Sequence, residues 1–145
     1  MQAFRTIHRY WAGLIVLAVL VQIGAAGYGA FNAAVKTDDH KTLNEDQFSN
    51  GFDFHNGLGY IIFLATVLLF FFAIFARFER RRIMMNLVLP LLLVVQIVLA
   101  WGGESTPWVG IFHPIVAFLI LGLAGRIAFE AWWGARRAAV ASAAT

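Results

Sequence analysis

Four long apolar stretches, separated by polar segments, dominate the pattern along the chain. They cover residues of about 11–31, 54–76, 83–103 and 109–131. An α-helix needs about 20 apolar residues to cross the hydrocarbon core of a bilayer, and each stretch reaches that length. Because only helices and closed barrels satisfy every backbone group in lipid, the pattern predicts an all-α, transmembrane four-helix up-down bundle.

Composition supports a membrane protein and leaves no room for a soluble domain. Of the 145 residues, 61% are hydrophobic and 13% are charged, and the mean hydropathy is +0.74. Soluble domains carry about 25% charged residues. We therefore expect a single transmembrane domain over residues 1–145, surrounded by the lipid bilayer. The absence of cysteine excludes disulfides, thiolate metal sites and Cys-attached haem.

The charged residues predict the orientation of the helices. Nine of the eleven Lys and Arg residues lie before the first stretch, between the second and third, or near the end of the fourth: Arg5, Arg9, Arg77, Arg80, Arg81, Arg82, Arg126, Arg136 and Arg137. Six of the eight acidic residues lie in the two other connections: Asp38, Asp39, Glu45, Asp46, Asp53 and Glu104. Lys and Arg collect in cytoplasmic loops, so both termini are predicted to be cytoplasmic in a multi-pass protein of the cell membrane. The net charge of +3 then serves insertion, and we expect no nucleic-acid partner.

The connection over residues 32–53 is the one long polar stretch. Its Asp, Asn, Ser and Gly residues favour turns, so a loop is predicted there. It contains His40 and Asp53, and His55 follows shortly after. These three side chains are candidates for a divalent metal site on the outer face.

A short internal repeat relates the first and third stretches. Residues 20–23 read Leu-Val-Gln-Ile, residues 94–97 read Val-Val-Gln-Ile, and small residues follow both. After each comes a connection and then a Phe-His pair that ends in His55 or His113. This order predicts one two-helix hairpin used twice, related by an axis along the membrane normal.

His55 and His113 are the strongest candidates for binding a cofactor. Both begin helices that run inward from the outer face, so we expect them at one depth on diagonally opposed helices, whose axes lie about 12–14 Å apart. That gap suits one metal with an imidazole on each side. Small residues on the other two helices, including Gly27 and Gly103, leave room there for a flat macrocycle. One hypothesis is therefore bis-histidine haem b, suited to electron transfer.

Structural explanations stand beside this hypothesis. Histidines at helix ends near headgroups need no ligand, and small residues also permit close helix packing. His113 precedes Pro114, a sequence that disfavours helical geometry at His113. The fourth helix is predicted to begin either at Pro114 or at Pro107, with a kink at Pro114.

Other polar residues in the apolar stretches are weaker candidates. Gln22 and Gln96 are interpreted either as interhelical hydrogen bonds or as cofactor contacts. His8 has no second histidine near the inner end, so it is interpreted as an interfacial residue.

Two segments around the histidines resemble an uncharacterised family of small bacterial four-span membrane proteins, a domain of unknown function. They read Phe-Asp-Phe-His-Asn-Gly-Leu-Gly-Tyr at residues 52–60 and Pro-Trp-Val-Gly-Ile-Phe-His-Pro at residues 107–114. The resemblance covers essentially the whole chain. It implies the four-helix fold and no particular activity.

The chain also resembles one half of haem A synthase. This resemblance implies that His55 and His113 are haem ligands, and that Gln22 and Gln96 occupy the positions of glutamines in its odd-numbered helices. The Glu-x-x-His-Arg pattern of the synthase is not matched, because Phe52 stands in place of Glu and the Arg is missing. Its outer-loop cysteines are also missing. The resemblance therefore implies a haem-binding fold and argues against haem A synthesis.

These observations predict a haem b-binding membrane protein that acts in electron transfer or haem handling. The alternative is a cofactor-free accessory subunit or assembly factor of a larger membrane complex. The small size favours this alternative, as does the lack of a Walker loop, a nucleophile elbow or an HExxH motif. Candidate protein partners are a larger membrane complex or further copies of the same chain in a homo-oligomer.

Overall fold

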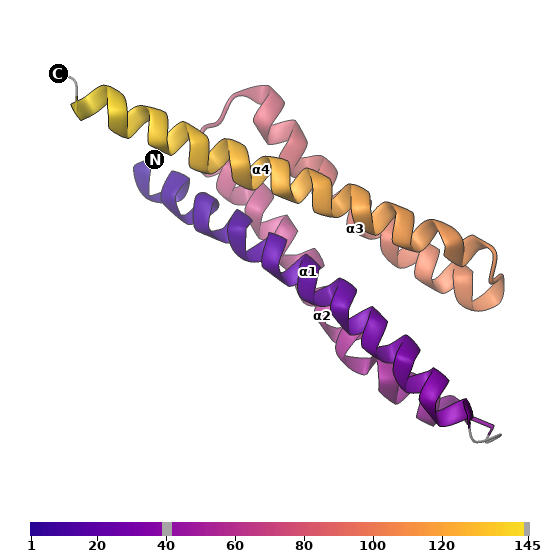
Figure 1. The fold of residues 1–145 in the computed structure, drawn as a ribbon. Coiled ribbons are helices and arrows are strands. Elements are labelled where there is room, and N and C mark those ends of the chain that lie inside the picture. Colours follow the sequence, from indigo (N-terminus) through magenta and orange to yellow (C-terminus); the bar gives the residue numbers. More distant parts are fainter. Residues whose placement is uncertain (39–41, 144–145) are drawn as a thin grey trace.

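The computed structural model describes residues 1–38 and 42–143, which form four long α-helices (Figure 1). They are α1 (Gln2–Asp38), α2 (Glu45–Phe75), α3 (Arg80–Ser105) and α4 (Phe112–Ala143), and a short 3₁₀ helix, η1 (Val109–Ile111), precedes α4. Each of the four is long and apolar enough to cross a membrane. The prediction of an all-helical protein with four candidate membrane spans is therefore confirmed.

The predicted loop over residues 32–53 is wrong in extent. Helix α1 continues to Asp38 and α2 begins at Glu45, so helix replaces most of that segment. The Asn44 side chain accepts a hydrogen bond from the backbone N–H of Gln47 at 2.8 Å, and the Gln47 side chain accepts one from the backbone N–H of Asn44 at 3.3 Å. This capping box, followed by two acidic residues in the first turn, stabilises a helix start that polar composition had obscured.

Helix α4 begins at neither of the two predicted prolines. Residues Val109–Ile111 form η1, and α4 starts at Phe112. Pro114 therefore lies in the first turn of α4, where an N–H would have no intrahelical partner and proline is tolerated without a kink. His113 is held in the same turn.

Helices α1 and α2 form an antiparallel hairpin. The Nε of Arg5 donates to the carbonyl oxygen of Ala76 at 3.3 Å, and the indole N–H of Trp11 donates to that of Ala65 at 2.9 Å. Later positions in α1 thus meet earlier positions in α2.

Helices α3 and α4 pair in the same way. Arg81 of α3 lies 3.9 Å from Glu130 of α4, and Glu130 also pairs with Arg126 of its own helix at 3.2 Å. The hairpins pack through α1 against α4 and α2 against α3, whereas the backbones of the diagonal pairs do not approach closely within the described residues. Figure 1 shows the two hairpins together near the chain termini and spread apart at their other ends.

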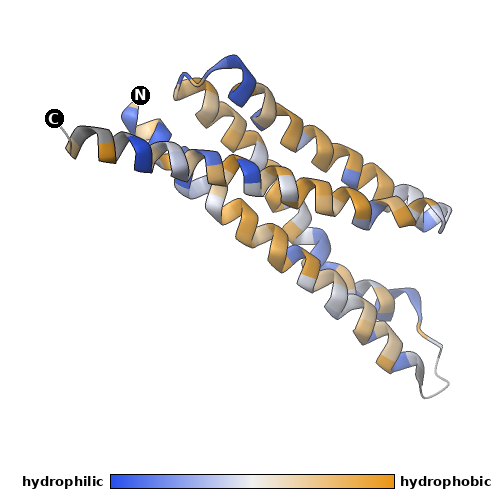
Figure 2. Ribbon diagram, turned by 45° about the horizontal axis from the view of Figure 1, so that its top comes forward, coloured by the Kyte–Doolittle hydropathy of each residue, from blue (hydrophilic) through white to orange (hydrophobic). Residues whose placement is uncertain are grey.

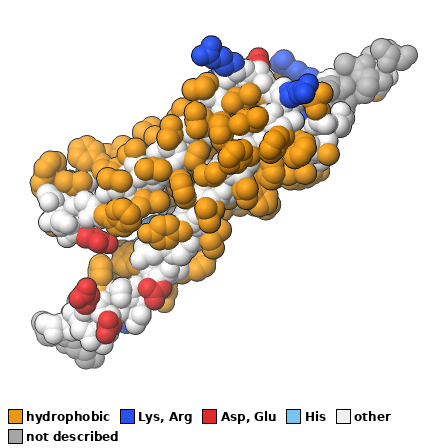
Figure 3. Space-filling view, turned by 180° about the vertical axis from the view of Figure 1, so that it is seen from behind, with side chains coloured by type: hydrophobic (Ala, Val, Ile, Leu, Met, Phe, Trp, Pro, Cys, Tyr) orange, Lys and Arg blue, Asp and Glu red, His pale blue; other side chains and the backbone are white. Residues whose placement is uncertain are grey.

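Most of the helix surface is apolar, which fits a lipid environment. Hydrophobic residues dominate all four helices in Figure 2. Most Lys and Arg side chains gather at one end of the molecule and most Asp and Glu at the other (Figure 3). The end with both termini and Arg80–Arg82 is named the basic end, and the end with Glu45, Asp53 and Glu104 the acidic end.

Only a narrow core is buried between the helices. It consists of small and aliphatic side chains: Ala12, Ile15, Val19, Ile62, Leu69, Leu89, Leu93, Ile120, Ala124, Ile127 and Ala128. In lipid such a core stabilises the bundle through close packing rather than through removal of apolar surface from water.

Candidate functional site

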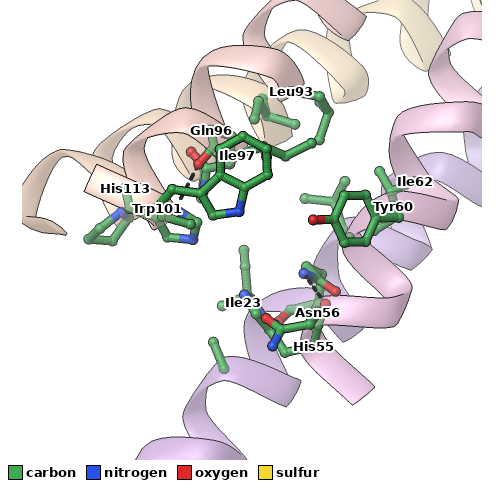
Figure 4. Close-up of a pocket in the computed structure, with 18 of the residues that line it drawn as sticks. Ile23, His55, Asn56, Tyr60, Ile62, Leu93, Gln96, Ile97, Trp101 and His113 are labelled. Carbon is green, nitrogen blue, oxygen red and sulfur yellow. Dashed lines mark hydrogen bonds between the residues drawn. The ribbon is translucent and has the colours of Figure 1, made fainter. Parts of the chain in front are cut away.

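A cavity of about 420 Å³ lies between the two hairpins, lined by all four helices. Figure 4 shows its lining residues on two facing walls, one contributed by the α3–α4 hairpin and one by the α1–α2 hairpin. The buried residues Val19, Ile62, Leu93 and Ile120 close it on the side of the core. The remaining lining is mostly apolar with a few polar side chains, as is typical of small-molecule sites.

His55 and His113 both line this cavity, one from each hairpin. Their ring centroids are 6.2 Å apart, and the ring planes are inclined by 57°. Each ring is partly buried. The structure thus brings together the two side chains that the sequence singled out.

Each imidazole is fixed by the backbone of the neighbouring helix. Nδ1 of His55 lies 3.0 Å from the carbonyl oxygen of Gln22, and Nδ1 of His113 lies 3.1 Å from that of Gln96. A carbonyl oxygen can only accept, so Nδ1 carries the proton in both rings. In the neutral imidazoles the lone pair therefore resides on Nε2, the form in which histidine binds a metal through that atom.

The spacing of the two rings matches two imidazoles on one metal. A metal–nitrogen bond is about 2.0–2.1 Å, and the ring centroid lies about 1.1 Å beyond the nitrogen, so two coaxial ligands place their centroids about 6.3 Å apart. The separation between His55 and His113 is 6.2 Å.

The cavity is built from two copies of one hairpin. A single shift in residue number relates four lining residues of α1 to four of α3: Val19, Gln22, Ile23 and Ala26 correspond to Leu93, Gln96, Ile97 and Ala100. A second shift relates three lining residues of α2 to three of α4: His55, Gly59 and Ile62 correspond to His113, Ala117 and Ile120. All fourteen residues line the cavity. The repeat inferred from a short sequence match therefore extends through the lining and through the hydrogen bond from each imidazole to a glutamine carbonyl oxygen.

The two glutamines have different roles. The Nε2 of Gln22 donates to the His55 carbonyl oxygen at 2.7 Å, which is the interhelical hydrogen bond that the sequence suggested. Gly59 makes room for this side chain, because a Cβ at Gly59 would lie 3.1 Å from that nitrogen. The Oε1 atoms of Gln22 and Gln96 are buried without a hydrogen-bond partner among the described residues.

Gly27 and Gly103, which the sequence suggested as cofactor contacts, do not line the cavity. Gly103 instead packs against η1, where a Cβ would lie 3.0 Å from the Cα of Gly110. A Cβ at Gly27 would meet nothing within 4 Å. The small residues that face the cavity are Ala26 and Ala100, one turn from the glutamines, and helical periodicity from Gln22 and Gln96 would have found them.

His8 is buried between the helices, where it has a polar partner that the sequence interpretation did not identify. Its side chain is 0% exposed, and its Nε2 lies 2.9 Å from Oδ1 of Asn86. The Asn86 amide also donates to the carbonyl oxygen of Arg82 at 2.8 Å, and Phe78 packs edge-on against the His8 ring. The sequence interpretation considered only a second histidine as a partner for His8, whereas a polar residue within an apolar stretch, Asn86, was the signal for this contact.

The expected outer metal site is not tested by the structure. His40 lies outside the described residues. Within residues 1–38 and 42–143, no group of three or more His, Cys, Asp or Glu residues is arranged to hold a metal ion.

Comparisons with known proteins find one family match, over part of the chain. A model of a family of unknown function, DUF6220, matches residues 46–104. This segment covers most of α2 and α3, so it includes His55 and Gln96 but not His113. The resemblance to an uncharacterised family is thus supported over this segment, and the resemblance to haem A synthase gains no support. No curated protein and no solved structure matches the chain.

Proposed function

We propose that the protein binds haem b through His55 and His113 and acts in electron transfer or haem handling. The observation that carries this proposal is the 6.2 Å separation of the two imidazole centroids across a cavity between two hairpins. It agrees with the spacing that two nitrogens on one metal require. The shared tautomer, with Nδ1 protonated in both rings, leaves both Nε2 atoms available as ligands.

The surroundings favour a metal within a flat macrocycle over a bare ion. Two imidazoles alone make a poor site for a free cation, and no third ligand of the usual kinds joins them among the described residues. Two axial nitrogens are, however, the full protein contribution to a six-coordinate haem. The cavity volume of about 420 Å³ lies within the range of about 300–1,000 Å³ for ligand pockets, and Ala26, Gly59, Ala100 and Ala117 keep side chains out of it.

The residues of the chain would act by positioning. The carbonyl oxygens of Gln22 and Gln96 fix the tautomer and direction of the imidazoles, and the Gln22 side chain adds a second tie to His55. With both His55 and His113 as its ligands, a bound haem would be suited to electron transfer rather than to binding a gas or a substrate. When bound, haem supplies a one-electron redox centre.

The proposal includes the arrangement in the membrane. We infer an up-down bundle with both termini and the basic end in the cytoplasm, and with the histidines toward the outer face of the cell membrane. The separation of charges between the two ends in Figure 3 supports this orientation through the preference of Lys and Arg for cytoplasmic loops.

A reduced-minus-oxidised absorption spectrum of the purified protein tests the proposal. A low-spin b-type spectrum is expected, and His55→Ala and His113→Ala should each abolish it or convert it to a high-spin form. The variant His8→Leu serves as a control, because His8 is buried away from the cavity lining. A colourless wild-type protein in haem-replete cells, purified with a defined membrane complex, would instead support the accessory-subunit alternative.

A further inference from the structure

The two halves of the cavity are alike except at one set of polar side chains. Asn56 and Tyr60 of α2 and Trp101 and Glu104 of α3 line the cavity and carry hydrogen-bonding groups. Figure 4 shows the Tyr60 hydroxyl and the Trp101 indole nitrogen directed into the space between the two walls. All four residues come from the two neighbouring helices α2 and α3.

Their counterparts in the repeat carry no such groups. The shift that relates His55 to His113 takes Asn56 to Pro114 and Tyr60 to Phe118, both of which line the cavity. The shift that relates Gln22 to Gln96 pairs Trp101 with Gly27 and Glu104 with Ala30. Neither Gly27 nor Ala30 has a hydrogen-bonding side chain. Hydrogen-bonding side chains other than the paired glutamines and histidines are therefore confined to the α2–α3 side.

This one-sided placement of hydrogen-bonding groups contrasts with the rest of the lining, in which each residue has an equivalent in the other hairpin. A ligand without a polar edge, such as an ion or a flat hydrocarbon, gains nothing from donors on one side alone. A planar ligand with carboxylates on one edge gains hydrogen bonds in one orientation and loses them after a half-turn, because buried oxygens without donors are unfavourable. The side chains of Asn56, Tyr60 and Trp101 each offer an N–H or O–H donor.

We propose that Asn56, Tyr60 and Trp101 orient the cofactor by binding its carboxylate edge, so that the propionates of haem lie on the α2–α3 side of the cavity. This inference rests on the proposed function and adds the orientation of the bound cofactor within the cavity. The paired histidines fix where the ligand is centred, and the unpaired donors select one of its two orientations. Glu104 lines the cavity on the same side, and its carboxylate group would repel the carboxylates of the ligand, so we expect it to weaken retention.

The test compares ferric protoporphyrin IX with its dimethyl ester, which lacks the free carboxylates. Wild-type protein freed of cofactor should retain the acid form more tightly than the ester by roughly three- to ten-fold. Asn56→Ala combined with Tyr60→Phe should remove most of this preference while the low-spin spectrum persists. Glu104→Gln should increase retention of the acid form and leave the ester unchanged.

Proton NMR of the ferric form provides a readout that does not depend on retention. The double variant should show shifted haem methyl signals that wild-type protein lacks, a second set that arises from haem turned so that its carboxylate edge faces the other side. The matched change in the other half, Phe118→Tyr, adds a donor on the α1–α4 side and should also populate the second set.

The outcomes separate the two proposals. A wild-type protein that takes up no haem overturns the function itself. Haem binding with full low-spin character, but with equal retention of acid and ester and one unchanged NMR pattern in all variants, overturns only the orientation by Asn56 and Tyr60.

Discussion

Gln22 and His55 are joined by two hydrogen bonds that run in opposite directions between α1 and α2. The Gln22 side chain donates to the His55 carbonyl oxygen at 2.7 Å, and Nδ1 of His55 donates to the Gln22 carbonyl oxygen at 3.0 Å. In the second hairpin, the described contacts include the bond from His113 to the Gln96 carbonyl oxygen but no bond from the Gln96 side chain. The two hairpins thus hold their histidines with different strength.

This difference predicts unequal effects of two matched substitutions. Gln22→Leu should destabilise the protein by about 1 kcal/mol, because an interhelical hydrogen bond is lost and the His55 carbonyl oxygen loses a donor. Gln96→Leu should be neutral or stabilising, since it removes a buried Oε1 that has no partner among the described residues. Denaturant unfolding in detergent measures both, and equal losses of stability for the two variants would contradict the assigned roles.

Filling the cavity should remove haem without unfolding the protein. Ala100→Phe places a large ring where Ala100 lines the cavity, so we expect loss of the low-spin spectrum with Tm changed by only a few degrees. Val98→Phe is the matched control, because Val98 is 55% exposed and does not line the cavity. Normal haem content in Ala100→Phe would show that the ligand lies elsewhere.

Gly103 and Gly27 should respond differently to alanine. Gly103→Ala brings a Cβ to 3.0 Å from the Gly110 Cα, where backbone must shift, and we expect a loss of about 1–3 kcal/mol. Gly27→Ala meets no neighbour within 4 Å and raises helix propensity, so stability should be unchanged or increase by up to about 1 kcal/mol. Thermal unfolding measures both. A strong effect of Gly27→Ala on haem content would restore it as a site residue.

The buried pair of His8 and Asn86 is predicted to stabilise the fold and not to affect the cofactor. Asn86→Leu leaves the proton on Nε2 of His8 without an acceptor and should cost about 1–3 kcal/mol. The double variant His8→Leu with Asn86→Leu should recover much of that loss, since both polar groups are then absent. The low-spin spectrum should persist in both variants. Its loss would place His8 in the haem site.

The inferred orientation can be tested by chemical labelling, because the chain contains no cysteine. Ser49→Cys, at the acidic end, should react with an impermeant maleimide in intact cells or spheroplasts. Arg80→Cys, at the basic end, should react only after the membrane is opened. Both residues are exposed in the structure. The reverse pattern would invert the bundle.

The membrane helices and the meeting of two histidines follow from simple features of the sequence. Apolar length predicts the four helices. His55 and His113 each follow a polar connection and open a returning helix, which places them at similar depth. The two rings lie close together, and each is hydrogen-bonded to a glutamine carbonyl oxygen. Both features follow if, in addition, the two hairpins pack against each other through equivalent faces.

Some features were not predicted from the sequence. They depend on which side of a helix a residue faces, or on contacts between residues that are far apart in the sequence. Gly27 is a small residue close to Gln22 in sequence, yet five residues turn it by about 140° from Gln22 around the helix, whereas Ala26 is only about 40° away. Gly103 lies two turns beyond Gln96, where η1 already covers it. The capping box at Asn44 was hidden within a segment whose composition favours turns.

The pairing of residues across the cavity has a consequence for how such a protein can arise. Each hairpin contributes one complete wall, and only a short link between Phe75 and Arg80 joins the second helix to the third. Two identical two-helix chains, associated about a twofold axis, would therefore assemble the same chamber with the same pair of imidazoles. Fusion of their genes would then free one half to diverge from the other.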